Sequence, residues 1–440
     1  MDLMRHEAAF GTTTSLWQSN SSSPESWPML HEDINADVTV VGAGIAGLSA
    51  ALMLARAGLD VVVLEAREPG WGASGRAGGG ICTGPLFVPA AEIRRSLGDE
   101  VGNKALQFLD RAVDLVFDRI ASFDDDCDLR MTGHIHLAHH PDKVEQLRRE
   151  MQEHRQRGLP VRWLDAEEGR FLSGSALLHY GGYLMEKNGL LNPLRYTRAH
   201  ARAAAKSGSR IFANSRATSV RREGGEWRLT TQYGSVRARR VIVCQNAYAD
   251  TLWPNLNRGQ IKFRAWNFVT QVLSPQLDAS ILPQGHQISD SHPIPKFFLK
   301  TSDRRLLVPA NARFFDAAPQ DHETVGYVRS QYPQMQDVQI EYKWMGVIGV
   351  VPGELPKLVS LDDGVWAIYG YTRGLPLATA LGAAAAGLCT GSAESKYPLP
   401  VEALKPMALL AVREFVMRVM TRLANSFVRK SPQPSPTRRS

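Results

Sequence analysis

The stretch Asp37-Val38-Thr39-Val40-Val41-Gly42-Ala43-Gly44-Ile45-Ala46-Gly47-Leu48 decides the fold of this 440-residue chain. Its β-branched run is typical of a strand buried in a parallel sheet. The glycine turn opens a run of helix formers that Gly58 ends, and residues 61–64 are a second apolar strand. A strand, a turn, a helix and a second strand within about 30 residues make one βαβ unit.

Three glycines of this stretch, Gly42, Gly44 and Gly47, have the GxGxxG spacing of a dinucleotide-binding turn. The first allows a tight turn, the second lets the backbone approach a pyrophosphate, and the third packs the helix against the strand. The helix N-terminus offers free N–H groups to the phosphates. Glu65 ends the second strand, where a carboxylate accepts hydrogen bonds from a ribose diol and disfavours a 2′-phosphate. We therefore expect an adenine dinucleotide, either FAD or NAD.

A second glycine-rich segment, residues 70–80, directly follows the ribose-binding strand. It has few side chains that could pack, which indicates that its backbone approaches a ligand closely. Ser74 and Arg76 add a hydroxyl and a cation suited to a pyrophosphate. This segment favours FAD over NAD.

Hydrophobic residues make up 44% and charged residues 22% of the chain, an ordinary globular composition that excludes a disordered or fibrous protein. The formal charge is +7, but the basic residues are diluted along the chain, so we expect no nucleic-acid partner. Four scattered cysteines without a CxxC pair indicate a reducing compartment. The uncharged residues 38–55 contain glycines and lack a signal-peptide flank, which predicts a soluble, cytoplasmic protein with no transmembrane segment.

Two further features of the sequence each allow two explanations. The histidines at positions 134, 136, 139 and 140 suggest a metal site, but no carboxylate or cysteine lies at ligand spacing, so we expect no metal. The C-terminal helix in residues 401–428 carries an apolar stripe, which predicts that it docks on the protein's own body; the alternative is a basic amphipathic helix on a membrane surface. Residues 429–440 cannot pack a core and are expected to be disordered.

The chain resembles the D-amino-acid-oxidase-type family of FAD-dependent oxidoreductases, and within it the amine oxidases of the gamma-glutamylputrescine oxidoreductase branch. The resemblance covers most of the chain, from residue 17 to residue 428. The motifs that carry it are Ser15-Leu16-Trp17, the dinucleotide stretch, Gly72-Ala-Ser-Gly-Arg-Ala-Gly-Gly, Asn246-Ala247-Tyr248, Trp344-Met345-Gly346, Leu355-Pro356 and Gly370-Tyr371.

This resemblance implies an α/β fold with an FAD-binding Rossmann-like domain of the glutathione-reductase type and a substrate domain built on an antiparallel sheet. The FAD-binding domain is expected in three segments, residues 37–95, 191–250 and 351–400. The substrate domain is expected in residues 96–190, which include a helical part, and in residues 251–350. An N-terminal arm (1–36), the C-terminal helix (401–428) and the tail (429–440) complete the chain.

The resemblance also implies which residues bind FAD, from the pyrophosphate turn to the loop beside the isoalloxazine ring. They are Gly42, Gly44, Ile45, Ala46, Gly47, Glu65, Ala66, Arg67, Ala73, Ser74, Arg76, Gly79, Gly80, Val220, Asn246, Gly346, Gly370, Thr372, Gly374 and Leu375. Arg373 is a candidate partner for a substrate carboxylate, and Trp344 and Tyr371 are candidates for the wall around an apolar or cationic group. The alternatives are a solvated arginine and two packed aromatic side chains. No catalytic side chain is assigned.

The sequence departs from the family pattern at two places that are expected near the flavin ring. The loop at residues 370–375 is one glycine shorter, and Pro309 lies in a strand where the family usually has two glycines. Proline removes an N–H donor and fixes φ. Lys262 is a candidate for assisting oxygen reduction, although a surface position is the favoured expectation for it.

The expected function is the FAD-dependent oxidation of a C–N bond in a small amine or amino acid to an imine, which water then hydrolyses. In this expectation O2 reoxidises the flavin and H2O2 is released. Three alternatives remain: a dehydrogenase that passes electrons to a quinone or carrier protein, an NAD-linked dehydrogenase, and a catalytically inactive flavin-binding protein.

Overall fold

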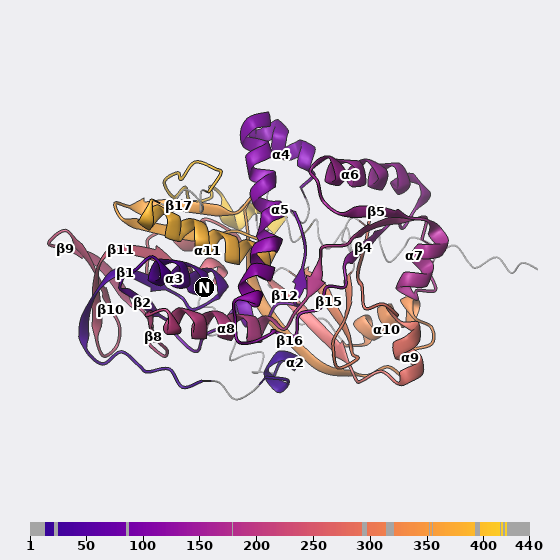
Figure 1. Cartoon of the computed structure of the whole chain (residues 1–440), viewed down its shortest axis with the longest axis horizontal. Coiled ribbons are helices and arrows are strands. Elements are labelled where there is room, and N and C mark those ends of the chain that lie inside the picture. Colours follow the sequence, from indigo (N-terminus) through magenta and orange to yellow (C-terminus); the bar gives the residue numbers. More distant parts are fainter. Residues whose placement is uncertain are drawn as a thin grey trace, which may run out of the picture.

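The computed structural model describes residues 14–21, 25–84, 88–177, 179–292, 297–313, 321–351, 353, 355–391, 397–413, 415, 416 and 419. Two eight-stranded sheets and their helices form the two halves of the molecule (Figure 1). The α/β fold expected from the sequence is confirmed, with a dinucleotide-binding sheet beside a largely antiparallel one.

The first sheet has the strand order β17-β18-β11-β1-β2-β8, and the hairpin β9–β10 pairs with β11. Strands β8, β2, β1, β11 and β18 are mutually parallel, so their carboxyl ends share one edge of the sheet. The strands are β1 (Asp33–Val41), β2 (Val61–Leu64), β8 (Arg210–Phe212), β9 (Ser219–Glu223), β10 (Glu226–Thr230), β11 (Ser235–Val243), β17 (Lys357–Asp362) and β18 (Val365–Tyr369).

Alternate side chains of this sheet enter two different cores because successive residues of a strand point to opposite faces. In β2, Val61 and Val63 pack against the helices, whereas Val62 and Leu64 pack in a second cluster with the β9–β10 hairpin. The helices on the first face are α3 (Ile45–Arg56), α4 (Ala90–Leu97), α5 (Asp99–Ala121), α8 (Pro193–Lys206) and α11 (Gly374–Thr390).

The position of α5 differs from the expected domain division, which gave residues 96–190 to the substrate domain. Its apolar stripe packs in the same core cluster as α3 and α11, on the dinucleotide-binding half. Alanines and glycines make most of α11, and such small side chains let another helix approach closely. The apolar stripe of α5 therefore packs on the cofactor half instead of on the antiparallel sheet.

The second sheet has the order β16-β12-β15-β14-β13-β4-β6-β5, and every pair is antiparallel except β13 with β4. Helices α6, α7, α9 and α10 lie on this half (Figure 1). The bounds are β4 (His134–Leu137), β5 (Val161–Leu164), β6 (Gly182–Met185), β12 (Ile261–Thr270), β13 (Gln287–Asp290), β14 (Phe297–Lys300), β15 (Leu306–Arg313), β16 (Ile340–Val350), α6 (Val144–Gln156), α7 (Ala166–Ser173), α9 (Pro275–Ser280) and α10 (Asp321–Gln331). A short two-stranded sheet joins β3 (Gly80–Ile81) to β7 (Gly189–Leu190).

The N-terminal arm is partly a core element, which the polar sequence of residues 1–36 does not predict. Leu16 and Trp17 of the short helix α2 (Leu16–Ser19) are buried in a cluster with β12, β14, β15 and β16. The arm also ends earlier than residue 36, because β1 already begins at Asp33.

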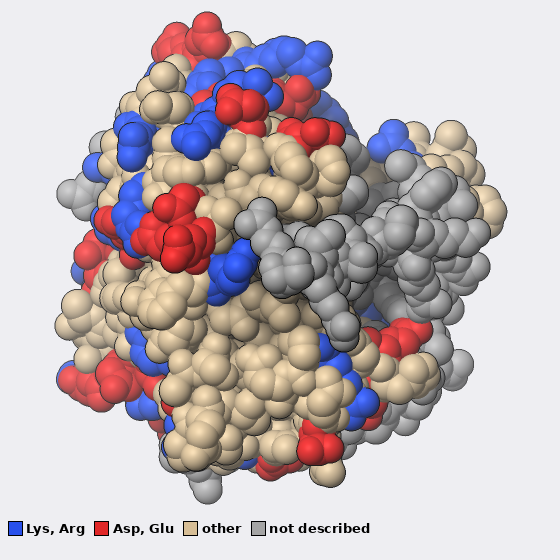
Figure 2. All heavy atoms as spheres, turned by 90° about the vertical axis from the view of Figure 1, so that its right-hand side faces the viewer, with Lys and Arg blue, Asp and Glu red and all other residues tan. Residues whose placement is uncertain are grey.

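The C-terminal segment docks on the body only at its start, where Met407 is buried in the second core cluster and Leu404 donates its N–H to Ser360 O at 3.1 Å. Residues 401–409 are not helical, and the described residues beyond Leu410 do not show the expected docking. Leu409, Phe415 and Val416 are exposed by 72%, 64% and 46%. The rest of the expected helix and the tail at 429–440 lie outside the described residues. Over the described ranges, no helix is both long and apolar enough to cross a lipid bilayer. On the face in Figure 2, described basic side chains alternate with acidic ones and form no continuous basic field.

Candidate cofactor and active site

A cavity of about 670 Å³ lies where the carboxyl edge of the first sheet meets the second sheet. Its floor is built by the ends of β1, β2 and β11, together with the 3₁₀ turn η1 (Ala73–Gly75) and the first residues of α11. Its other wall comes from β12, β15 and β16. The cavity therefore connects the predicted cofactor elements to the predicted substrate sheet.

The turn between β1 and α3 has the geometry that the glycine spacing predicts. Gly42 has φ +103°, and its N–H donates to Leu64 O at 2.8 Å. Gly44 is the N-cap of α3 and has no side chain to fill the cavity. Gly47 packs on the turn itself, because a Cβ on it would lie 1.9 Å from Gly42 O. The positive end of α3 thus faces the cavity.

Glu65 holds the turn from the end of β2. Its Oε2 accepts the backbone N–H of Ala43 at 2.7 Å, and its Oε1 accepts that of Arg67 at 2.9 Å. Burial raises the pKa of this carboxyl, and the two backbone donors oppose that shift. A carboxylate acceptor at this edge fits a ribose diol.

The second glycine-rich segment meets the first at the N-terminus of α3. Ser74 Oγ accepts the N–H of Ile45 at 3.0 Å. Arg76 donates from Nε to Trp71 O at 2.8 Å, and its guanidinium lies over the Trp71 ring at 5.1 Å from the centroid. Arg67 lies near the same ring, 5.4 Å from its centroid, so two cations flank the cavity-lining indole.

At the other end of the cavity, Asn246 joins three chain segments. It has φ +42°, its Oδ1 accepts the N–H of Gly370 at 3.1 Å, and its backbone O accepts Gln260 Nε2 at 2.6 Å. Gly370 has φ +77° and starts the shortened loop that leads into α11. The loop ends at the N-terminus of α11, which presents its positive end to the cavity.

The structure brings most predicted site residues to the cavity wall. Those that line it are Gly42, Gly44, Ile45, Ala46, Glu65, Ala66, Arg67, Ala73, Ser74, Arg76, Asn246, Gly346, Thr372, Gly374, Leu375 and the predicted substrate residue Tyr371. Those that do not line it are Gly47, Gly79, Gly80, Val220, Gly370, Arg373 and Trp344.

For two of the predicted residues, the structure shows why the side chain does not line the cavity. Val220 pairs with Leu229 in the β9–β10 hairpin, and the wall near it is formed by Arg216 and Ala217, which precede the hairpin. Trp344 is 1% exposed and donates from Nε1 to Arg76 O at 2.9 Å, so the structure gives it a packing and hydrogen-bonding position behind the wall. In both cases residues nearby in the sequence, and not the predicted one, line the cavity.

Several wall residues were not identified from the sequence. Trp71, Tyr248, Trp266 and Asn267 line the cavity, and no spacing motif points to the last two because they come from the middle of β12. Lys262 was expected at the surface and instead lines the cavity, with Nζ donating to Ala249 O at 2.8 Å. The alternating pattern of β12 is the only signal that could have placed Lys262 on the same face as its neighbours.

The histidines of β4 form a polar cluster on the second sheet. His134 Nε2 and His136 Nδ1 both lie within hydrogen-bond distance of Ser289 Oγ, at 2.8 and 2.7 Å. Burial lowers the pKa of His136 to about 4, with a smaller contribution from the charge of Arg373. Within the described residues, no three histidine, cysteine or acidic side chains gather as metal ligands.

Comparisons with known proteins agree with this geometry. Residues 37–388 match the family described as "DAO: FAD dependent oxidoreductase". The gamma-glutamylputrescine oxidoreductase of Escherichia coli (strain K12) is 29% identical over 88% of this chain and 93% of that protein. A probable oxidoreductase, OrdL, of Rhizobium meliloti (strain 1021) is 29% identical over 85% of this chain and 90% of its own length.

Solved structures share the fold at lower identity. L-amino acid deaminase from Proteus vulgaris superposes with a TM-score of 0.71 at 19% identity, covering 90% of this chain and 99% of that one. Glycine oxidase from Geobacillus kaustophilus gives a TM-score of 0.68 at 21% identity, covering 85% of this chain and 99% of that one. These likenesses support the fold that the strand order describes.

The fold and the cavity define a two-domain flavoprotein oxidoreductase. The geometry fits a dinucleotide with a flavin ring at the far end of the cavity. Gly42 and Gly44 have no side chain to block the approach of the ligand, Glu65 supplies an acceptor, and the N-termini of α3 and α11 supply two positive ends. The chain belongs to the DAO family of FAD-dependent oxidoreductases that act on amines and amino acids, and its cofactor is FAD.

Proposed function

We propose that this protein oxidises the C–N bond of a small amine or amino acid to an imine, which water hydrolyses, and that O2 is the final electron acceptor, giving H2O2. The observation that carries the proposal is the continuity of the cavity, which runs from the dinucleotide turn to the wall formed by β12, β15 and β16. FAD, when bound, supplies a hydride acceptor. The protein's own residues bind the amine, orient it and limit the access of water.

The residues of the ring end suit the binding of an uncharged amine. Tyr371 and Trp266 are buried and line the cavity together with Ala265 and Leu375. An apolar wall of this kind disfavours a free ammonium and favours the neutral amine, whose lone pair is available for C–N oxidation. Asn267 is the polar group in the same stretch, and its Nδ2 donates to Arg76 O at 3.1 Å.

Arg373 supports a substrate that carries a carboxylate. It is the N-cap of α11, and its Nε is buried without a hydrogen-bond partner among the described residues. Arg373 is half-buried and lies outside the cavity wall, and within the described ranges its buried Nε lacks the hydrogen bond that burial of a polar group requires. A substrate carboxylate would supply it through two parallel hydrogen bonds.

The imidazoles near Arg373 are uncharged at neutral pH. Burial, with the charge of Arg373 as a further cause, lowers the pKa of His136 to about 4 and that of His154 to about 3. Tyr183 lies between these two imidazoles, with ring-centroid distances of 5.5 and 5.6 Å. At neutral pH these imidazoles therefore add no positive charge to that of Arg373, and the Arg373 charge favours a substrate with a carboxylate over a diamine.

Lys262 supports O2 as the acceptor. Its ammonium lies in the cavity wall and is held by Ala249 O at 2.8 Å. A fixed positive charge stabilises the negative charge that develops when O2 takes up an electron. The charge is in place before the reaction, so little reorganisation is needed.

Pro309 favours a second candidate, a dehydrogenase that delivers electrons to a quinone or a carrier protein. It lines the cavity, and it pairs with Asn267 in the interior strand β15, where it cannot donate a ladder hydrogen bond. The ring end of this chain thus lacks a donor that the family pattern provides.

Anaerobic reduction of the flavin tests the proposal. The purified holoprotein is mixed with polyamines, N-methyl amino acids, and D- and L-amino acids, and bleaching of the flavin absorption is followed. The oxidase proposal expects bleaching by at least one amine and about one H2O2 per imine once air is admitted. Imine formation without peroxide supports the dehydrogenase, and failure of every amine to bleach the flavin contradicts both.

A further inference from the structure

We propose that Trp17 and Trp344 are cofactor-positioning residues: their indole N–H groups orient two peptide units of the second glycine-rich segment, so that the N–H groups of Ala77 and Gly78 face the flavin. Neither tryptophan lines the cavity, whereas Ala77 and Gly78 both do. The two indoles therefore act through the backbone and make no contact of their own with the ligand space.

The contacts of the two indoles fall on consecutive carbonyl groups. Trp17 Nε1 donates to Ala77 O at 2.8 Å, and Trp344 Nε1 donates to Arg76 O at 2.9 Å. Asn267 Nδ2 also donates to Arg76 O, at 3.1 Å. The three donors come from the N-terminal arm, β16 and β12, which are far apart in the sequence.

The planar trans peptide explains how a carbonyl contact on one side controls an N–H on the other. In a trans peptide the C=O and the following N–H point in opposite directions. Because the carbonyls of Arg76 and Ala77 point to the indoles, the N–H groups of Ala77 and Gly78 point away from the indoles. Both residues line the cavity. Neither N–H donates to another group in the described part of the chain. Two such free donors suit the oxygen or nitrogen edge of a flavin ring.

Rigid packing keeps the two indoles in place. Trp17 is 3% exposed and Trp344 is 1% exposed. Their rings meet edge to face, with centroids 6.0 Å apart and an interplanar angle of 73°. Gly79 continues the segment at φ +91°, and a Cβ on it would lie 3.5 Å from the Trp17 ring and 2.3 Å from Leu191 O. The segment has no freedom to turn its peptides without displacing the indoles.

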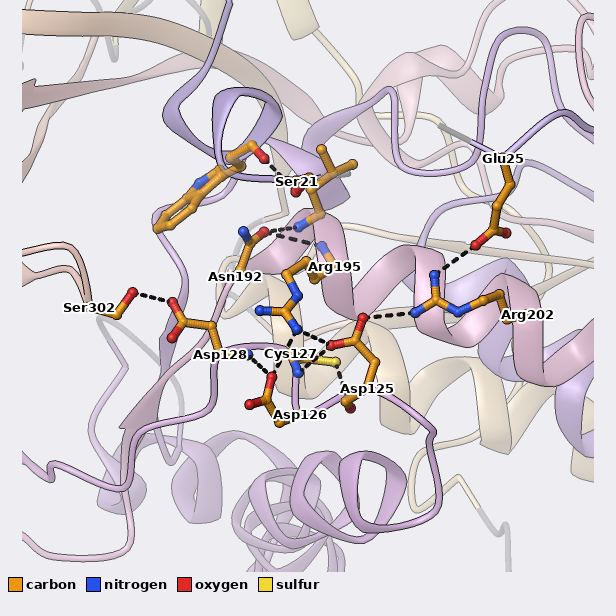
Figure 3. Close-up of polar contacts among 12 residues, drawn as sticks. Ser21, Glu25, Asp125, Asp126, Cys127, Asp128, Asn192, Arg195, Arg202 and Ser302 are labelled. Atoms are coloured by element: carbon orange, nitrogen blue, oxygen red, sulfur yellow. Dashed lines mark hydrogen bonds and ion pairs between the residues drawn. The ribbon is translucent and has the colours of Figure 1, made fainter. Parts of the chain in front are cut away.

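The arm that carries Trp17 is anchored to the body by ion pairs (Figure 3). Arg202 of α8 pairs with Glu25 of the arm at 2.8 Å and with Asp125 at 2.8 Å. Arg195 pairs with Asp125 at 2.7 Å and with Asp126 at 2.9 Å. The partly buried position of this network makes it less sensitive to salt than exposed pairs. It holds the segment after Trp17 to the same helix that packs under the glycine-rich segment.

The test removes each indole N–H and keeps an aromatic ring at the position; only 3-benzothienylalanine also keeps the two-ring shape of tryptophan. The variants are Trp17→Phe and Trp344→Phe, together with 3-benzothienylalanine at position 17, which has the shape of tryptophan with sulfur in place of N–H. The matched control is Trp227→Phe. Trp227 is 5% exposed and donates from Nε1 to Asp363 O at 3.1 Å, in a hairpin outside the cavity wall.

The decisive measurement is the midpoint potential of the bound flavin in each holoprotein, supported by the FAD dissociation constant. We expect a more negative potential at both positions, because misaligned N–H donors stabilise the reduced ring less well. We also expect roughly tenfold weaker FAD binding, equivalent to about 1.4 kcal/mol. The control should lose thermal stability without either change. A purely structural role of the two tryptophans would leave the midpoint potential of the flavin unchanged. An unchanged potential in the benzothienylalanine and Trp344→Phe proteins therefore overturns the proposal, whatever the melting temperatures of these proteins.

Discussion

Glu65 Oε2 accepts the backbone N–H of Ala43 at 2.7 Å, so the carboxylate expected to bind a ribose also fixes the turn expected to bind the phosphates. Removing it should weaken FAD binding in two ways, through the lost ribose acceptor and through a looser turn. Glu65→Ala is expected to raise the FAD dissociation constant about a hundredfold, since two charge-assisted hydrogen bonds are worth about 3 kcal/mol together. Fluorescence of released FAD measures this. Asp60→Asn, an exposed carboxylate paired with Arg210, is the control and should bind FAD normally.

Gly47 should be intolerant of any side chain even though it does not line the cavity. A Cβ would lie 1.9 Å from Gly42 O and 3.2 Å from a Val40 methyl group, so helix α3 would have to move away from β1. Gly47→Ala is expected to destabilise the protein by about 3 kcal/mol, at the upper end of overpacking effects. Urea unfolding is the measurement. Gly326→Ala in α10 has no atom within 4 Å of the added Cβ and should be neutral or slightly stabilising.

Lys262 should affect the oxidative half of the reaction selectively. In Lys262→Met the cavity keeps its size but loses a fixed charge, and flavin reoxidation by O2 is expected to slow about a hundredfold. Stopped-flow measurement of reoxidation, after anaerobic reduction by dithionite, isolates this step from substrate binding. Lys206→Met, at an exposed position on the last turn of α8, should reoxidise at the normal rate. Equal reoxidation rates in both variants would mean that Lys262 gives no support to O2 as the electron acceptor.

Arg373 should determine the preference for carboxylates. Arg373→Gln is expected to weaken binding of benzoate about a hundredfold, as judged by perturbation of the flavin spectrum, because a charge-assisted pair worth about 3 kcal/mol is lost. Arg373→Lys should recover part of the affinity, since it restores the charge but not the planar fork. Arg221→Gln on the exposed β9 strand is the control. Undiminished benzoate binding in Arg373→Gln would place the carboxylate elsewhere.

His200 should make the protein less stable in acid. It is fully buried, and burial lowers its pKa to about 3, so the folded protein keeps it neutral while the unfolded chain takes up a proton near pH 6.5. Between pH 3 and pH 6.5 the unfolded state therefore binds more protons than the folded state. The free energy of unfolding falls as the pH decreases from 6.5 towards 3. His200→Phe, which keeps the edge-to-face contact with Phe123, should reduce the slope by up to about 1.4 kcal/mol per pH unit. Urea midpoints at pH 7.5, 6.0 and 5.0 measure the slope, and an unchanged slope would contradict the assignment.

The pyrophosphate end of the site could be predicted because its requirements are local. Gly42, Gly44 and Glu65 act through backbone geometry and one carboxylate at a fixed chain distance, and each contributes where the sequence indicates. Turn residues likewise separate the four short strands β8 to β11, so these strands too are set by local sequence.

The ring end could not be predicted in the same way, because its wall is assembled from strands whose pairing spans long sequence distances. Lys262 and Asn267 reach the cavity through the register of β12 with β15 and β16, which the alternation of side chains within β12 does not determine by itself. Trp344 belongs to a motif of the family, yet its side chain points to Arg76 O behind the wall.

The sequence alone determined the dinucleotide-binding turn, because glycine positions impose backbone conformations directly, and its resemblance to a known family implied the flavin protein with a second, antiparallel sheet. Only the tertiary structure decided that Trp17 supports the second glycine-rich segment, that α5 covers the cofactor half, and which side chains face the ring. These outcomes depend on packing between distant segments. Packing is decided by the shape and burial of the whole fold, which no short stretch of sequence contains.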